Sequence, residues 1–476
     1  MLSYLKTHKT SLLFGVLALL FYGTFAYDVV RSDFTRLFLL YAALFFISYK
    51  LIQFNKANFW LLAGIAITAR CMFLFAIPNL SQDFYRFIWD GRMLAQGFNP
   101  YLSTPLSFFE AGNTTIIPQA RALYEGMGTL NASHFTNYPP INQLCFVIAG
   151  LLSGKSILGA AIIFRLQIIL ADIGILLIGR KLLRALKLPE YNIFWFILNP
   201  YIIIEMTGNL HYESVMLFFV VLCLYLLQQK KWIWAAVALG LSVSVKLIPL
   251  LFLPLFLQYF LTGGNALRKP HFRSSFPLGI RFRESVRLLP KLIIFYVIVL
   301  GAVLLSFVPF LSGDFASNFG ASIALWFQKF EFNASIYYII RWIGYQTIGW
   351  NIIEDVGKIL PLIFISILLL MTFFRKNASL IQLITAMVLS ISLYFALSTT
   401  VHPWYVATPL LLCVFTRYRF PLVWSFFVIL SYTAYGATGF KENLWFVALE
   451  YITVFSVAIY EIAVSPQRQR ALTFLR

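Results

Sequence analysis

Long apolar segments recur along the whole chain, separated by short polar stretches. Most hold about 17 to 25 residues, enough for an α-helix to cross a hydrocarbon core of about 30 Å. Hydrophobic and polar residues do not alternate within them as they would in the strands of a membrane β-barrel. The pattern predicts an all-α, polytopic membrane protein with about 13–14 transmembrane helices. We place them at residues 11–30, 35–52, 57–79, 157–179, 192–208, 212–228, 232–246, 248–262, 290–312, 357–374, 379–397, 403–416, 420–436 and 442–463.

One further apolar segment, 141–153, is short, because as a helix it is only about 20 Å long. If it crossed the membrane, the basic cluster between Arg180 and Lys187 would move to the outer side. Loops rich in Lys and Arg normally stay in the cytoplasm. We therefore predict that 141–153 is half-inserted or re-entrant.

The composition agrees with a membrane protein. Hydrophobic residues make up 60% of the chain and charged residues 12%, whereas soluble domains contain about 25% charged residues. The net charge of +19 comes from Lys and Arg in short stretches between the spans. It therefore records a topology with the N-terminus in the cytoplasm, and it does not indicate a nucleic-acid partner.

This topology predicts one transmembrane domain, residues 1–476, with three large loops. The basic loop on the cytoplasmic side is expected to touch anionic lipid headgroups. The other two loops face outward. The loops are 80–140 (first outer loop), 263–289 (cytoplasmic) and 313–350 (second outer loop).

The first outer loop opens with a charged and aromatic stretch. On a helix, Asp83 and Asp90 share one face, and Arg86 lies between them within reach of either carboxylate. One interpretation is a short interfacial helix held together by Arg–Asp pairs. The other is a site in which one carboxylate is structural and the other acts as a general base.

Four more polar clusters fall at the outer ends of predicted spans, each explained by local structure or by contact with a substrate. They are 137–140 with Tyr138, 208–213 with Asn209, His211 and Glu213, 330–335 with Asn333 and then Arg341, and 399–405 with His402, Trp404 and Tyr405.

The cluster 399–405 favours an anion. Pro403 suits the first position of a helix, where free N–H groups and the positive end of the helix dipole attract negative charge. His402 lies at this mouth and can donate a hydrogen bond to a phosphate. Lys246 also emerges at the outer surface, where its ammonium group either holds a phosphate or snorkels to the headgroups.

Two ionisable residues lie inside the predicted span 157–179. Arg165 and Asp172 are seven residues apart on one helix face. Because a charge within the membrane needs a partner, we expect them to neutralise each other.

Together these motifs resemble a known family. Residues 83–92, Asp-Phe-Tyr-Arg-Phe-Ile-Trp-Asp-Gly-Arg, and 97–101, Gly-Phe-Asn-Pro-Tyr, are similar to the outer-loop signature of bacterial GT-C glycosyltransferases that use polyprenyl-phosphate mannose. The order of the weaker motifs over residues 57–440 is similar too. These motifs are Tyr138-Pro139-Pro140, Gly208-Asn209-x-His211, Lys246-x-x-Pro249, Phe332-Asn333-x-Ser335 and His402-Pro403-Trp404-Tyr405. The chain departs at Glu213, because in that family an acidic or amide residue often follows the His more closely.

The resemblance implies a GT-C-like enzyme of the bacterial inner membrane whose active site faces the periplasm or exterior. Such an enzyme moves a hexose, mannose in that family, from a polyprenyl-phosphate donor to a glycan, glycolipid or protein acceptor. It implies no metal and no cofactor beyond the lipid-linked donor. An aspartate in the first outer loop acts as the base, and Asp83 is in that position.

The residues themselves support the same division of roles. Asp83 is the carboxylate nearest the end of its span and is the predicted base. His402 and Lys246 are predicted to bind the donor phosphate, with Arg341 as a further candidate. The predicted supporting or substrate-binding residues are Arg86, Asp90, Arg92, Tyr138, Asn209, His211, Glu213, Asn333, Trp404 and Tyr405.

Three other functions stay open at this level. A lipid-linked sugar transporter or flippase would show repeated halves and charges near the bilayer midplane. A non-catalytic scaffold would not need Asp83 and His402 in one cavity. An O-antigen ligase or polymerase would use a pyrophosphate-linked oligosaccharide donor.

Overall fold

The computed structural model describes residues 9–112, 115–264, 282–328, 330–436 and 439–464, so most of the predicted loop 263–289 lies outside the described residues. The α-helices are α2 Lys9–Tyr27, α3 Phe34–Phe54, α4 Phe59–Cys71, α5 Asp83–Ala95, α6 Pro105–Glu110, α7 Ala120–Ala132, α8 Pro140–Leu152, α9 Ile157–Ala185, α10 Phe194–Ile197, α11 Pro200–Ile202, α12 Glu213–Gln228, α13 Trp232–Val245, α14 Phe256–Leu261, α15 Phe282–Phe307, α16 Phe315–Gln328, α17 Ile336–Thr347, α18 Ile353–Phe374, α19 Leu380–Leu397, α20 Ala407–Cys413, α21 Phe420–Phe427 and α22 Leu444–Ala463. The tighter or wider helical turns are η2 Glu190–Ile193, η3 Ile203–Gly208, η4 Ile248–Leu255, η5 Val308–Phe310, η6 Pro403–Val406 and η7 Val428–Ala434. Strands β1 Tyr435–Gly436 and β2 Gly439–Phe440 pair antiparallel.

The predicted all-α, polytopic architecture is confirmed. Within the part of the chain that the structure describes, seven helices are long and apolar enough to cross a membrane, namely α2, α3, α9, α15 from Leu288 onward, α18, α19 and α22. A broken pair, Pro200–Gly208 and Glu213–Gln228, bends by 117° and counts as an eighth span if taken as one. The other predicted spans are apolar helices of 10–17 residues.

Proline explains why some predicted spans are short or irregular. Pro249 and Pro254 remove backbone N–H donors from the predicted span 248–262. Its first part is therefore the 3₁₀ turn η4 rather than an α-helix. The predicted span 192–208 is divided in the same way, because Pro200 starts a new short helix, α11, inside it.

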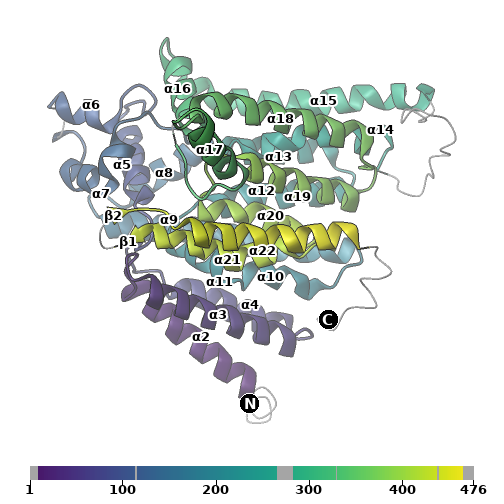
Figure 1. Cartoon of the computed structure of the whole chain (residues 1–476), viewed down its shortest axis with the longest axis horizontal. Coiled ribbons are helices and arrows are strands. Elements are labelled where there is room, and N and C mark those ends of the chain that lie inside the picture. The colour runs from purple at the N-terminus through teal and green to yellow at the C-terminus, as the bar shows by residue number, and fades with distance from the viewer. Residues whose placement is uncertain (1–8, 113–114, 265–281, 329, 437–438, 465–476) are drawn as a thin grey trace.

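The predicted outer loop 80–140 lies at one end of the long helices. Figure 1 shows α5, α6 and α7 at the left of the molecule, and α14 with the beginning of α15 at the right. Residues that flank the predicted cytoplasmic loop are thus at the opposite end from α5. Helix α8, predicted to be half-inserted or re-entrant, packs between α5 and α9, and its depth in the membrane stays a prediction.

Helices α5 and α8 cross in very close contact because both carry glycine at the crossing. A Cβ added to Gly91 would lie 2.2 Å from the Phe146 carbonyl oxygen, and one added to Gly150 would lie 2.7 Å from the Gly91 carbonyl oxygen. Small residues at such crossings let two backbones approach closely. This contact holds α5, the helix that begins with Asp83, against the rest of the protein.

The charges buried in the spans are paired differently from the prediction. Asp172 of α9 accepts a 2.7 Å hydrogen bond from Arg70 of α4, not from Arg165. Arg165 instead donates to the carbonyl oxygens of Thr207 and Gly208, at 2.9 and 3.2 Å. The predicted Arg165–Asp172 pair is wrong because two helical turns separate these residues by about 10 Å along α9, while neighbouring elements lie closer.

Replacing Gly91 or Gly150 with alanine should lower the thermal unfolding midpoint of the detergent-solubilised protein. Overpacking of a tight contact costs about 1–3 kcal/mol. Gly64→Ala is the matched control, because an added Cβ there meets no heavy atom within 4 Å among the described residues. Unchanged midpoints for Gly91→Ala and Gly150→Ala would contradict the close crossing.

Candidate functional site

Asp83 is the first residue of α5, and it is half-buried. Asn131 of α7 donates a 3.2 Å hydrogen bond to one carboxylate oxygen. Burial raises the pKa of Asp83, while this hydrogen bond and the positive charges of Lys246 and Arg31 oppose the rise. A carboxylate with a raised pKa is a stronger base than one in water, and such groups are typical of sites that accept protons.

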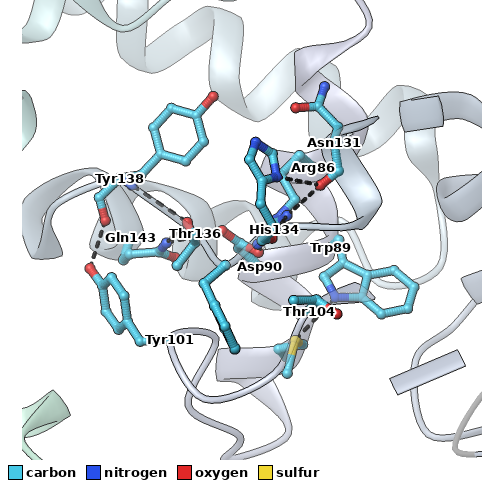
Figure 2. A network of polar contacts seen from close by, with 12 residues as sticks. Arg86, Trp89, Asp90, Tyr101, Thr104, Asn131, His134, Thr136, Tyr138 and Gln143 are labelled. Atoms are coloured by element: carbon cyan, nitrogen blue, oxygen red, sulfur yellow. Dashed lines mark hydrogen bonds and ion pairs between the residues drawn. The ribbon is translucent and has the colours of Figure 1, made fainter. Parts of the chain in front are cut away.

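Asp90, the second acid on this face, is bound into the fold. Its carboxylate accepts hydrogen bonds from Arg86 at 2.8 Å and from Gln143 at 3.0 Å, and it is fully buried. Figure 2 shows Arg86 also reaching the end of α7 and the loop after it, where it donates to the carbonyl oxygens of Asn131 at 2.6 Å and His134 at 2.9 Å. The predicted Arg–Asp pair therefore involves Asp90. Asp83 does not take part in it and remains the candidate for the general base.

Arg92 and Tyr138 support this end of the molecule in the same way. Arg92 is buried and donates to the carbonyl oxygen of Pro118 and, at 3.3 Å, to the side chain of Gln119. The Tyr138 carbonyl oxygen accepts a 2.6 Å hydrogen bond from Tyr101 (Figure 2). Burial, followed by the nearby negative charge of Asp83, raises the pKa of Tyr138, so its phenol lies within electrostatic reach of the predicted base.

Lys246 supplies a positive charge beside Asp83. It directly follows α13 and forms an ion pair with Glu213, the first residue of α12. The Glu213 side chain is 3% exposed and that of Lys246 is 19% exposed, so Lys246 is the more accessible side chain of the pair. Glu213 is therefore bound to Lys246 inside the protein, and the predicted phosphate-binding role of Lys246 stays a prediction.

Three rings from distant parts of the chain form a stack. Trp404 lies between His402 and His211, with ring centroids 4.5 and 3.8 Å apart and interplanar angles of 5° and 20°. Phe332 and Tyr405 flank His402 on its other sides, at 5.4 Å each. The stack fixes the orientation of the His402 imidazole.

The turn 208–213 is the buried scaffold of this stack. Asn209 and Tyr432 donate to the carboxylate of Glu205 at 3.1 and 2.7 Å, and the His211 ring lies 3.8 Å from the same carboxylate. Arg165 donates hydrogen bonds to the carbonyl oxygens of Thr207 and Gly208, at the beginning of the turn. Asn209 and His211 are therefore buried supporting residues in this structure.

His402 is a neutral hydrogen-bonding group rather than a cation. Burial, together with the positive charge of Lys246, lowers its pKa to about 3. The predicted helix start at Pro403 is confirmed, although the first turn is the 3₁₀ turn η6 that leads into α20. An anion bound here would meet the positive charge of Lys246 and a neutral imidazole.

Asn333 and Arg341 are engaged in other contacts. The Asn333 backbone N–H donates to Glu442 at 2.6 Å, and its side-chain amide donates to Glu450 at 3.3 Å. A parallel bridge joins Phe332 to Thr400, so this segment positions the loop of His402. Arg341 forms an ion pair with Glu331, and a phosphate-binding role would require that pair to open.

Sequence reasoning missed Arg31 and Asn131. The Arg31 guanidinium stacks 4.1 Å over the Tyr435 ring and donates to the Leu80 carbonyl oxygen at 3.2 Å. One signal was available, because Arg31 is a basic residue in a loop that the predicted topology places outside, where such residues are rare. No comparable signal marks Asn131.

Among the residues that the structure describes, no group of three or more His, Cys, Asp or Glu side chains is arranged to hold a metal ion. The expectation that the reaction needs neither metal nor cofactor stays a prediction.

Comparison with known proteins confirms the resemblance to mannosyltransferases. Residues 37–262 match the model of a family described as α-(1→6)-mannopyranosyltransferase, N-terminal domain. The chain is 25% identical over 190 residues to α-(1→6)-mannopyranosyltransferase A of Corynebacterium glutamicum, which covers 38% of this chain and 35% of that protein. It is also 25% identical over 150 residues to α-(1→6)-mannopyranosyltransferase B of the same organism, which covers 31% and 24%. The chain thus matches about a third and a quarter of these relatives' lengths.

The carboxyl group of Asp83 should titrate above its usual value of 3.8, because burial is the largest influence on it. Difference infrared spectra of wild type against Asp83→Asn isolate its carboxyl band. Asn131→Ala should move the midpoint about one to two pH units higher, because a hydrogen bond to a charged group is worth about 1.5–3 kcal/mol and one pKa unit about 1.4 kcal/mol.

Thr129→Ala, an exposed position on the same helix α7, is the control and should leave the Asp83 midpoint unchanged. A midpoint at or below 3.8 in the wild type, or a downward shift in Asn131→Ala, would contradict this description of the site.

Proposed function

We propose that this protein is a membrane-embedded glycosyltransferase that moves mannose from a polyprenyl-phosphate donor to an acceptor on the non-cytoplasmic side. The observation that carries the proposal is a convergence around Lys246. Its positive charge acts on both Asp83 and His402, although these residues are more than 300 positions apart in the chain. Mannose is proposed as the transferred sugar because both relatives are named mannopyranosyltransferases.

The proposed chemistry is a single displacement at the anomeric carbon. Asp83 accepts the proton of an acceptor hydroxyl, and the hydroxyl oxygen forms a bond to that carbon. The bond from the carbon to the phosphate oxygen breaks, and its electron pair leaves with polyprenyl phosphate. Attack opposite to the leaving group inverts the anomeric configuration.

Lys246 and His402 stabilise the leaving phosphate in this scheme. The ammonium group provides the positive charge, and the imidazole donates an N–H whose direction the Trp404 stack fixes. Preorganised groups of this kind stabilise developing charge without reorganising during the reaction.

Outward orientation is supported by the distribution of charge. The predicted basic loop 263–289 is joined to α14 and α15, whose adjoining ends are opposite to α5 (Figure 1). Positively charged loops stay in the cytoplasm, so Asp83 faces the exterior. We propose the bacterial inner membrane as the location, with the acceptor a glycan, a glycolipid or a protein.

Among the residues that the structure describes, no specific contact favours a transporter or flippase, or a non-catalytic scaffold. The charges buried in the spans, such as Arg70 and Asp172, bind each other and backbone carbonyl oxygens, so they stabilise helix packing rather than a transport path. A scaffold protein has no need of a cation whose charge acts on both an acid and an imidazole.

Asp83→Asn should reduce mannose transfer by about 10²–10⁴-fold, the usual contribution of a general base. In the wild type, transfer should fall as the pH drops through the raised pKa of Asp83, because the protonated acid cannot accept a proton. Release of polyprenyl phosphate from polyprenyl-phosphate mannose measures both effects.

Asp90→Asn is the contrasting variant, because it breaks the buried pair with Arg86 and should lower the thermal unfolding midpoint. Asp83→Asn should leave that midpoint nearly unchanged. Full activity in Asp83→Asn would eliminate this base.

Lys246→Gln combined with Glu213→Gln should weaken binding of polyprenyl phosphate by about 10–100-fold, because a charge-assisted hydrogen bond is worth about 1.5–3 kcal/mol. The double change avoids leaving a buried carboxylate unpaired. Glu213→Gln alone keeps the ammonium group and should bind the lipid at least as well as the wild type. Equal affinity for all three proteins would contradict a phosphate-binding role for Lys246.

A further inference from the structure

A cleft of about 610 Å³ opens beside the amino end of α5. Its walls come from the loop between α2 and α3, from residues 78–85, and from the hairpin of β1 and β2. This volume lies within the range of about 300–1,000 Å³ that is typical of small-molecule sites. Lys246 and His402, the proposed donor-phosphate residues, do not line it.

The lining combines aromatic faces with hydrogen-bonding groups. Tyr85, Tyr435 and Phe440 contribute rings, and Phe440 remains 56% exposed. The guanidinium of Arg31 and the side-chain amide of Gln82 contribute N–H donors. An isoprenoid chain would need an apolar lining throughout, whereas a sugar ring offers both an apolar C–H face and a rim of hydroxyl groups, which match this mixture.

The cleft adjoins the proposed base. Gln82 and Phe84, which precede and follow Asp83, both line it. Arg31 lies in the cleft wall, and its charge lowers the pKa of Asp83. Asp83 itself is not part of the lining, but both of its chain neighbours are, and the lining residues differ from the proposed donor-phosphate residues Lys246 and His402.

We propose that this cleft binds a carbohydrate acceptor and presents one of its hydroxyl groups to Asp83. The exposed Phe440 ring stacks on the sugar, and the Arg31 guanidinium, which lies over the Tyr435 ring, donates hydrogen bonds to its hydroxyl groups. The inference rests on the proposed function. It assigns recognition of the acceptor to the hairpin of β1 and β2 and to the loop between α2 and α3.

The test measures the KM of each substrate separately, with the full-length protein, polyprenyl-phosphate mannose as donor and an α-(1→6)-linked mannotriose as acceptor. Phe440→Ala and Arg31→Ala should raise the KM for mannotriose by about fivefold or more, since each removes one stacking or hydrogen-bonding contact. The KM for the donor should stay within about twofold of wild type.

Matched controls are available at the same end of the molecule. Trp445→Ala removes a more exposed aromatic side chain (87% exposed) close to Phe440 in sequence. Arg121→Ala removes an exposed cation of α7. Neither residue lines the cleft, so both variants should keep the wild-type KM for mannotriose. An unchanged acceptor KM in Phe440→Ala and Arg31→Ala, or a raised donor KM in its place, would overturn the inference.

A binding measurement separates this inference from the proposed function. Saturation-transfer NMR detects mannotriose on the wild-type protein without any reaction. The signal should weaken strongly in Phe440→Ala and persist when polyprenyl phosphate is added. If the wild type transfers no mannose yet shows this binding, the proposed function fails and the cleft remains a carbohydrate site. No signal, or displacement of mannotriose by polyprenyl phosphate, would refute the acceptor cleft.

Discussion

The ion pair of Lys246 and Glu213 is the interaction on which the site depends. A lone ammonium group at the end of a membrane helix would turn toward water or headgroups, and Glu213 instead holds it inside the protein. From there its charge acts on Asp83 and on His402. The charge of Lys246 thus influences both the first outer loop and a segment near the other end of the chain, and the Lys246 side chain is 19% exposed.

The remaining polar contacts in the interior hold these groups in place. Arg86 binds the carbonyl oxygen of Asn131, and the Asn131 side chain in turn binds Asp83. Arg165 binds the turn that carries His211, and His211 stacks on Trp404. Such chains of contacts have a physical cause, because a buried polar group in a membrane protein is costly unless it is bonded.

The sequence was sufficient for the long apolar helices, for the helix start at Pro403 and for the pair of Arg86 and Asp90 on one face of α5. These features are local, since hydrophobic runs, proline geometry and helical periodicity determine them. It was not sufficient for the partner of Asp172, for the ring stack or for Asn131. Those contacts join elements that are distant in the chain, and periodicity identifies a helix face without identifying its neighbour.

The position of a bound phosphate tests the central claim most directly. A cryo-electron microscopy map of the protein with polyprenyl phosphate should place the phosphate within hydrogen-bonding distance of Lys246 and His402, with Asp83 facing it across the site. A phosphate bound elsewhere, for example at Arg341 after its pair with Glu331 has opened, would contradict the account.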